Sequence, residues 1–388
     1  MTPLRQAIAA WSDGWPRWRD QLLARPGFRR WAESHLLTRW IARRRAAQVF
    51  DLMAGFVYSQ VLLACVRLGL LEHLAVAGPQ EASALARHLG LPLEGCERLL
   101  HAAVALRLLE PRSAHRFGLG PLGLPVAHDA GLRALVLHHQ ALYADLADPV
   151  ARLRGTAAPG ELARFWPYAQ APGECGDAQQ AGAYSALMAA TQPMVAAQVL
   201  QAYPLTRHRR LLDVGGGEGA FAIAAATAEA RLRVEVLDLP EVTSRATTRL
   251  AAAGLAPRSQ VWPTNFLQDP LPPGADLITL LRVVHDHDDA SVRQLLAAVH
   301  AALAPGGRLL LAEPMADTPS ASAMGDAYFG FYLLAMGQGR PRTARRLRAL
   351  LQEAGFIHVR LLPTTMPLLV QVVLAERLAG TEVPQNYV

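Results

Sequence analysis

The sequence has 388 residues, of which 52% are hydrophobic and 18% are charged, with a formal net charge of +6. This length allows two domains with a large core, and the basic balance permits contact with nucleic acid or an anionic membrane without requiring it. The three cysteines, Cys65, Cys96 and Cys175, lie far apart, which excludes a disulfide framework and a zinc-ligand pair.

The first residues lack the apolar stretch of a signal peptide, and no segment reaches the roughly 20 uninterrupted apolar residues of a membrane span. We therefore expect a cytoplasmic protein, which fits the scattered cysteines.

The N-terminal segment, residues 1–48, holds five of the seven tryptophans and ten arginines, with only three acidic residues. Trp11, Trp15 and Trp18 stand at helical spacing, which predicts a helix. Two interpretations stay open for this extension, which we bound at residues 1–45. It packs on the protein or on a partner subunit, or it contacts an anionic membrane surface through Trp and Arg.

Residues 46–145 are predicted to form a helical module. Gly69 is expected to end one helix, and residues 82–89 and 94–108 are typical of a helix-turn-helix followed by a small β-wing at 112–122. This winged-helix pattern leaves a DNA-binding regulator open. The second helix is mostly apolar and lacks a polar face for reading bases, which favours a dimerisation module.

Residues 146–200 are predicted to be a helical connector that contributes to an acceptor pocket. Trp166, Tyr184 and Met188 are candidate pocket residues, together with Phe329 further along the chain. The alternative is that these side chains belong to the core.

Strand and helix patterns alternate from residue 201 to the end, and they predict an α/β domain with a Rossmann-like, seven-stranded, doubly wound sheet. The predicted strands are 211–214, 233–237, 260–264, 276–281, 308–312, 357–361 and 368–374. A short turn separates the last two, so we expect the final strand to run antiparallel.

The turn after the first of these strands is rich in glycine and is predicted to bind a cofactor at a helix N-terminus. Gly215, Gly217 and Ala220 fit the pattern of a nicotinamide or flavin dinucleotide site. Asp213 followed by alternate glycines fits S-adenosylmethionine equally well. The turn alone does not separate the two.

Polar residues follow four further strands, at the edge of the sheet that faces a ligand. Asp238 is spaced to meet ribose hydroxyls, and Asn265 and Phe266 are placed to flank an adenine. His285 closes the fourth strand, where a general base is useful. Glu313 ends the fifth strand, in position to hydrogen-bond that imidazole.

These motifs together resemble the S-adenosylmethionine-dependent O-methyltransferases of the plant caffeate and bacterial polyketide type. The resemblance rests on residues 213–219, 238–240, 264–267, 285–286 and 305–307. It implies a homodimer with a winged-helix-like dimerisation domain, His285 as the base, Glu313 as its orienting carboxylate and no metal. The implied cofactor-binding residues are Asp213, Gly215, Gly217, Asp238, Leu239, Asn265, Phe266 and Arg282.

The chain departs from the family pattern at three places. Asn265 stands where the family usually has Asp, and His287 stands where it has an aromatic residue. Pro341 replaces a carboxylate that often precedes the Arg-Thr pair at 342–343. The resemblance therefore does not predict a second carboxylate on His285.

Residues 43–74 resemble the carotenoid-modifying branch of this family in purple photosynthetic bacteria, which methylates the 1-hydroxyl of acyclic hydroxycarotenoids. This implies a hydrophobic acceptor and a position at the inner, photosynthetic membrane for a peripheral enzyme. Three alternatives stay open: a methyltransferase of phenols or polyketides, a DNA-binding regulator and an NAD-dependent oxidoreductase.

Overall fold

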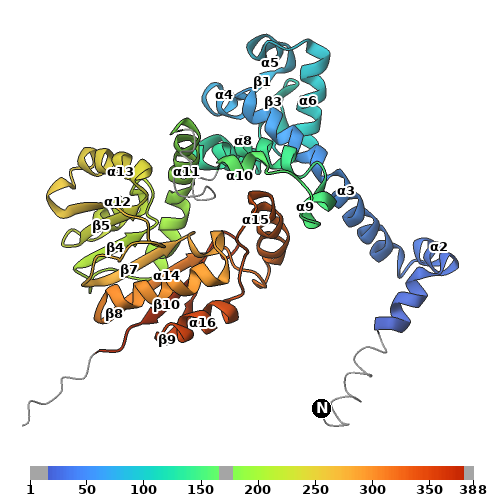
Figure 1. Cartoon of the computed structure of the whole chain (residues 1–388). Coiled ribbons are helices and arrows are strands. Elements are labelled where there is room, and N and C mark those ends of the chain that lie inside the picture. Colours follow the sequence, from blue (N-terminus) through green and yellow to red (C-terminus); the bar gives the residue numbers. More distant parts are fainter. Residues whose placement is uncertain (1–15, 166–177, 380–388) are drawn as a thin grey trace, which may run out of the picture. The chain divides into compact units, whose positions relative to one another are not determined.

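The structure is a computed structural model that describes residues 16–165 and 178–379 (Figure 1). The chain divides into two compact units, Met1–Pro125 and Val126–Val388. The sequence suggests a later division, at residue 145. The difference arises because α8 (Ala130–Asp145) packs on α11 (Ala178–Ala202), which belongs to the second unit.

The first unit is mainly helical. After a helical stretch at residues 16–24, its elements are α2 (Pro26–Ser34), α3 (Arg39–Arg67), α4 (Leu70–Ala77), β1 (Gln80–Glu81), α5 (Ala82–Leu89), α6 (Leu93–Ala105), β2 (Leu109–Arg112) and β3 (Arg116–Leu119), and α7 (Gly123–His128) spans the boundary. Gly69 separates α3 from α4 with a φ of 66°, a left-handed conformation that glycine adopts without strain. The predicted helix end is therefore confirmed.

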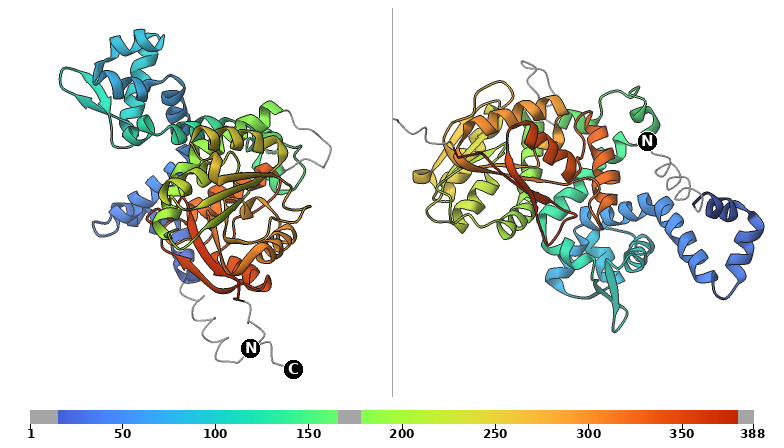
Figure 2. Two further views of the ribbon diagram at one scale, coloured as in Figure 1. Left: turned by 90° about the vertical axis from the view of Figure 1, so that its left-hand side faces the viewer. Right: turned by 90° about the horizontal axis from the view of Figure 1, so that it is seen from below.

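The helix-turn-helix and the wing are also present as predicted. α5 and α6 are the two helices, and β1, β3 and β2 form a three-stranded antiparallel sheet. The β2–β3 hairpin projects from the helices in both views of Figure 2. The exposed side of α6 carries Glu94 and Glu97 beside Arg98, which forms an ion pair with Glu94, so this helix does not present a basic surface to DNA phosphates.

α3 corrects one expectation from the sequence. It is long and apolar enough to cross a membrane, judged by length and composition alone, and no other helix in the described ranges is. A search for uninterrupted apolar residues misses this helix, because isolated polar residues such as Asp51 and Gln60 divide the apolar stretch without making the helix polar. Leu63, Cys65 and Val66 near its end are buried.

The second unit begins with helices and continues into the sheet. Its remaining helices are α9 (Pro149–Leu153), α10 (Glu161–Phe165), α12 (Ala220–Ala228), α13 (Pro240–Ala252), α14 (Asp289–Ala302), α15 (Gly330–Met336) and α16 (Ala344–Glu353), with short 3-10 turns at Ala256–Arg258 and Val284–Asp286 and a π-helical segment at Ala323–Phe329. Leu142, Leu162 and Leu333 join α8, α10 and α15 in one small core.

The sheet has the seven strands that the sequence predicts. They are β4 (Arg210–Val214), β5 (Arg233–Asp238), β6 (Ser259–Pro263), β7 (Ala275–Leu281), β8 (Leu303–Glu313), β9 (Ile357–Leu362) and β10 (Gln371–Glu376), in the order β6-β5-β4-β7-β8-β10-β9. The first five are parallel, and β10 runs antiparallel to both of its neighbours, as expected for the final strand.

Helices cover both faces of the sheet (Figure 1). Buried side chains of α14 and α16 pack on one face, whereas α11, α12 and α13 pack on the other. This is why the strands of the middle of the sheet are almost continuously buried. Only the strand ends remain for polar chemistry, and the carboxyl ends of β4, β5, β7 and β8 carry the residues described next.

Candidate active site

The glycine turn between β4 and α12 is built for a close approach by a ligand. Gly215, Gly217 and Gly219 have φ values of 69°, 57° and 76°, which favour glycine. A Cβ at Gly215 would stand 2.7 Å from Val283, so no side chain fits there. At Gly217 a Cβ would meet nothing within 4 Å, and a side chain would extend into open space.

Asp238, at the end of β5, fixes this turn. Its carboxylate accepts hydrogen bonds from the Gly217 N–H at 2.7 Å and from the Leu239 N–H at 2.8 Å. Asp238 nonetheless lines the cleft beside the turn. It is fully buried and therefore holds the glycine backbone at the edge of the cleft.

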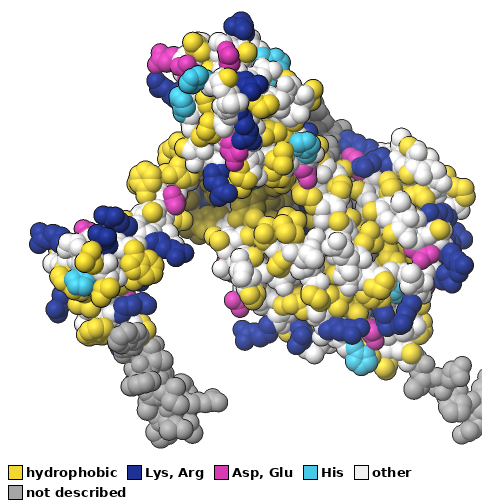
Figure 3. All heavy atoms as spheres, turned by 180° about the vertical axis from the view of Figure 1, so that it is seen from behind, with side chains coloured by type: hydrophobic (Ala, Val, Ile, Leu, Met, Phe, Trp, Pro, Cys, Tyr) yellow, Lys and Arg dark blue, Asp and Glu magenta, His cyan; other side chains and the backbone are white. Residues whose placement is uncertain are grey.

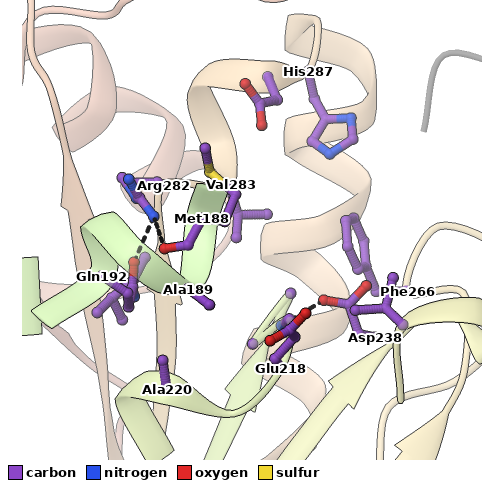
Figure 4. A pocket seen from close by; sticks show the side chains of 16 residues that line it. Met188, Ala189, Gln192, Glu218, Ala220, Asp238, Phe266, Arg282, Val283 and His287 are labelled. Atoms are coloured by element: carbon purple, nitrogen blue, oxygen red, sulfur yellow. Dashed lines mark hydrogen bonds between the residues drawn. The ribbon is translucent and has the colours of Figure 1, made fainter. Parts of the chain in front are cut away.

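We call this hollow the glycine cleft (Figure 4). It is lined by Met188, Ala189, Gln192, Gly215, Gly216, Gly217, Glu218, Ala220, Asp238, Val242, Phe266, Leu281, Arg282, Val283, Asp286 and His287. Five of the predicted cofactor residues are in this set, namely Gly215, Gly217, Asp238, Phe266 and Arg282. Asp213, Leu239 and Asn265 are not.

These three residues lie behind or beside the cleft. Asp213 is buried under the turn, where its Oδ1 accepts a hydrogen bond of 2.6 Å from Thr279, and burial raises its pKa to about 7. The Asn265 side-chain oxygen accepts from the Leu267 N–H at 3.0 Å, so it shapes its own turn.

The sequence reasoning missed the part of the cleft that α11 supplies. Arg282 donates to Gln192 Oε1 at 2.7 Å, to Thr191 Oγ1 at 2.9 Å and to the Met188 carbonyl at 3.2 Å. Figure 4 shows Met188 and Gln192 beside the guanidinium. Arg282 has a φ of 57°, an unusual value for a residue with a side chain, and such strain is often found at functional sites.

His285 follows β7, in the 3-10 turn Val284–Asp286, and it is buried. Its Nδ1 is hydrogen-bonded to Glu313 Oε2, as the sequence predicts. The other oxygen of Glu313 accepts from the backbone N–H groups of Val283 and Val284, at 3.1 and 2.7 Å. A carboxylate so occupied cannot rotate freely, and it fixes the imidazole with Nε2 away from it.

A second carboxylate stands at that other nitrogen. Asp286 Oδ1 lies 3.2 Å from His285 Nε2, although Pro341 removes the carboxylate that the family pattern would place there. Burial by itself would lower the pKa of His285. The negative charges of Asp286 and Glu313 outweigh burial and raise this pKa above its ordinary value.

The turn that carries His285 is held by the segment after α15. Arg340 N–H donates to the His285 carbonyl at 2.8 Å, and Arg342 donates to the carbonyls of Val284 and His287, each at 2.7 Å. Gly339, with a φ of 80°, makes this approach possible because a Cβ there would stand 2.3 Å from the His285 carbonyl.

A second hollow, which we call the apolar pocket, adjoins the glycine cleft and has a volume of about 330 Å³. It is lined by Leu135, His139, Leu187, Met188, Thr191, Met194, Val195, Arg282, His285, Asp286, Met324, Tyr328, Phe329, Tyr332, Met336, Leu368 and Leu369. Met188, Arg282 and Asp286 line both hollows, so His285 in the apolar pocket is next to the glycine cleft.

Two of the four predicted pocket residues, Met188 and Phe329, line the apolar pocket. Trp166 lies outside the described residues, and so does the side chain of Tyr184. The sequence reasoning missed Tyr328 and Tyr332, although the aromatic run at 328–332 was a usable signal. His287 lines the glycine cleft and not the apolar pocket. Burial lowers its pKa to about 4.

No group of three or more His, Cys, Asp or Glu side chains within the described ranges is arranged to hold a metal ion.

Two family profiles match the chain. One, described as an O-methyltransferase domain, matches residues 143–357, and the other, an O-methyltransferase dimerisation domain, matches residues 50–124. The chain belongs to the O-methyltransferase family. It is an S-adenosylmethionine-dependent O-methyltransferase, and not the oxidoreductase or the DNA-binding regulator that the sequence left open. Its dimerisation domain indicates a homodimer.

Two curated relatives are demethylspheroidene O-methyltransferases. The protein of Cereibacter sphaeroides is 43% identical over 89% of this chain and 91% of its own length. The protein of Rhodobacter capsulatus is 43% identical over 87% and 84%. Among solved structures, mitomycin 7-O-methyltransferase is 27% identical and superposes with a TM-score of 0.71 over 87% of this chain and 99% of its own.

Proposed function

We propose that this enzyme methylates the tertiary 1-hydroxyl of acyclic carotenoids, with S-adenosylmethionine as the methyl donor. The observation that carries the proposal is an apolar pocket that surrounds a buried His–carboxylate pair. The 43% identity to demethylspheroidene O-methyltransferases supports the same acceptor.

The glycine cleft fits the methyl donor. The open space at Gly217 leaves room for a ligand against bare backbone, and Asp238 lines the same cleft. Gly215, Gly217, Asp238, Phe266 and Arg282 would hold the donor. When bound, S-adenosylmethionine supplies a methyl group already activated by its sulfonium, so positioning of the acceptor carries much of the catalysis.

His285 acts on the acceptor hydroxyl. A tertiary alcohol is too weakly acidic to ionise first, so its proton must leave as the new C–O bond forms. His285 Nε2 takes that proton, which requires the imidazole to be neutral beforehand and the Asp286 carboxylate, 3.2 Å away in this structure, to turn aside from Nε2. Glu313 then stabilises the imidazolium through Nδ1–H, because it already lies on that nitrogen.

A phenol or polyketide is the alternative acceptor, since a phenol ionises more easily and the same residues would serve it. A competition assay separates the two. Equal concentrations of a 1-hydroxycarotenoid and a panel of phenols are offered with labelled S-adenosylmethionine. We expect label in the carotenoid, and preferential labelling of a phenol would overturn the proposed acceptor.

We also propose that residues before the dimerisation domain hold the enzyme at the surface of an anionic membrane, where a water-insoluble acceptor is found. Large apolar side chains are exposed there: Trp18, Trp31, Leu36, Leu37, Trp40 and Ile41. Figure 3 shows arginine side chains (dark blue) between hydrophobic ones (yellow) on this segment, at the left of the view. This combination favours the interface between headgroups and acyl chains.

A further inference from the structure

The apolar pocket is too small for the acceptor proposed above. Its volume of about 330 Å³ is near the lower end of the roughly 300–1,000 Å³ that drug-sized ligands occupy. A carotenoid is much longer than such a ligand. With its hydroxylated end at His285, most of the polyene must therefore continue outside the pocket.

The loop between β9 and β10 marks the place where the pocket opens. Leu368 and Leu369 of this loop line the pocket. Among the described residues that line it, Leu368 is the one whose side chain is exposed, at 38%, and all the others are buried or half-buried. Met366, two residues earlier, is 43% exposed. The loop therefore carries two exposed apolar side chains, one of which lines the pocket.

The loop is held in this position by α11. The buried side chain of Gln198 accepts hydrogen bonds from the Thr365 hydroxyl at 3.0 Å and from the Met366 N–H at 2.8 Å. Thr364 donates to the Val370 carbonyl at 2.9 Å, which closes the loop on itself. Leu368 and Met366 are thus held at fixed positions beside the pocket, where a ligand that extends out of it would cover them.

We propose that residues 364–369 form a binding subsite for the polyene chain of the acceptor, with Leu368 and Met366 as its contacts and Gln198 as its positioning residue. The inference rests on the proposed function. It predicts that this loop distinguishes long acceptors from short ones, whereas His285 and the glycine cleft treat both alike.

The test compares two acceptors that carry the same dimethylcarbinol end, a 1-hydroxycarotenoid and a short tertiary alcohol that fits inside the pocket. Met366→Asp, in the loop but not in the lining of the pocket, should raise KM for the carotenoid by about tenfold or more, because apolar burial of a side chain is replaced by a charge. KM and kcat for the short alcohol should stay unchanged. Leu378→Asp, at an exposed leucine outside the pocket, is the matched control.

Gln198 provides a second, independent arm. Gln198→Leu removes the accepting oxygen and should raise KM for the carotenoid alone. Gln198→Glu keeps an accepting oxygen and should have a KM for the carotenoid close to that of the wild type. The subsite would be overturned by equal KM shifts for both acceptors, or by the same KM shift in Leu378→Asp. A loss of vesicle binding without a change in selectivity between the two acceptors would overturn it as well. No methylation of the carotenoid by the wild type would instead overturn the proposed function, and the subsite with it.

Discussion

At the scale of single residues, the pair His285 and Glu313 decides the chemistry. We predict that His285→Ala binds S-adenosylmethionine normally but loses methyl transfer by roughly 10²–10⁴-fold, the range typical of a positioned general base. Glu313→Gln should lose less, because the imidazole remains. Calorimetry measures the binding and labelled methyl transfer measures the rate. Near-native turnover by His285→Ala would mean that another base acts.

The two carboxylates beside His285 predict the pH dependence of the reaction. They raise its pKa, so its protonated form, which cannot act as a base, persists above the ordinary histidine range. The rate should therefore increase with pH until His285 is neutral. Asp286→Asn removes one of the negative charges and should move the rise of kcat/KM to lower pH. A profile that stays in place in the variant contradicts this assignment.

At the scale of elements, the glycine turn between β4 and α12 controls binding of the methyl donor. Gly217→Val should abolish binding for two reasons: its side chain would enter the open space of the glycine cleft, and valine disfavours a φ of 57°. Gly55, which lies in a helix of the other unit with nothing within 4 Å of its Cβ position, offers a control as Gly55→Ala. Unchanged affinity in a folded Gly217→Val would refute the placement of the donor.

The elements also show what the sequence can and cannot predict. The glycine turn, Asp238, His285 and Glu313 follow strand ends, and parallel strands bring their carboxyl ends to one edge, so their proximity was predictable. The apolar pocket was predictable only in part, since Met188 and Phe329 were expected there and most of the other lining residues were not. Its walls come from α8, α11, α15 and the β9–β10 loop, and only tertiary packing brings such distant segments together.

Asp286 shows the same limit within a single motif. The sequence placed it next to His285, but neighbours in a chain often point in different directions. The 3-10 turn is what brings its carboxylate to Nε2. The segment at 339–342, which holds this turn, is more than fifty residues away in sequence, and no local pattern indicated the contact.

At the scale of the whole molecule, the N-terminal segment predicts a salt-dependent attachment to lipid. Each arginine near an anionic surface contributes on the order of 1 kcal/mol to binding. The arginines within residues 16–45, together with the exposed tryptophans, therefore suffice to hold the segment at the surface. The full chain should sediment with anionic vesicles, less at high salt because exposed charges are screened. A chain starting near Ala46 keeps most of α3 and should sediment less than the full chain. Equal sedimentation of both, or no preference for anionic lipid, would leave a packing role.

The most direct test of the account as a whole is methyl transfer by the purified enzyme from isotope-labelled S-adenosylmethionine to an acyclic 1-hydroxycarotenoid. The product is isolated and the labelled carbon is located by NMR. The account predicts a labelled methoxy group on the tertiary carbon, formed by the wild type and nearly absent with His285→Ala. Label on any other atom, or equal product from the two proteins, would contradict it.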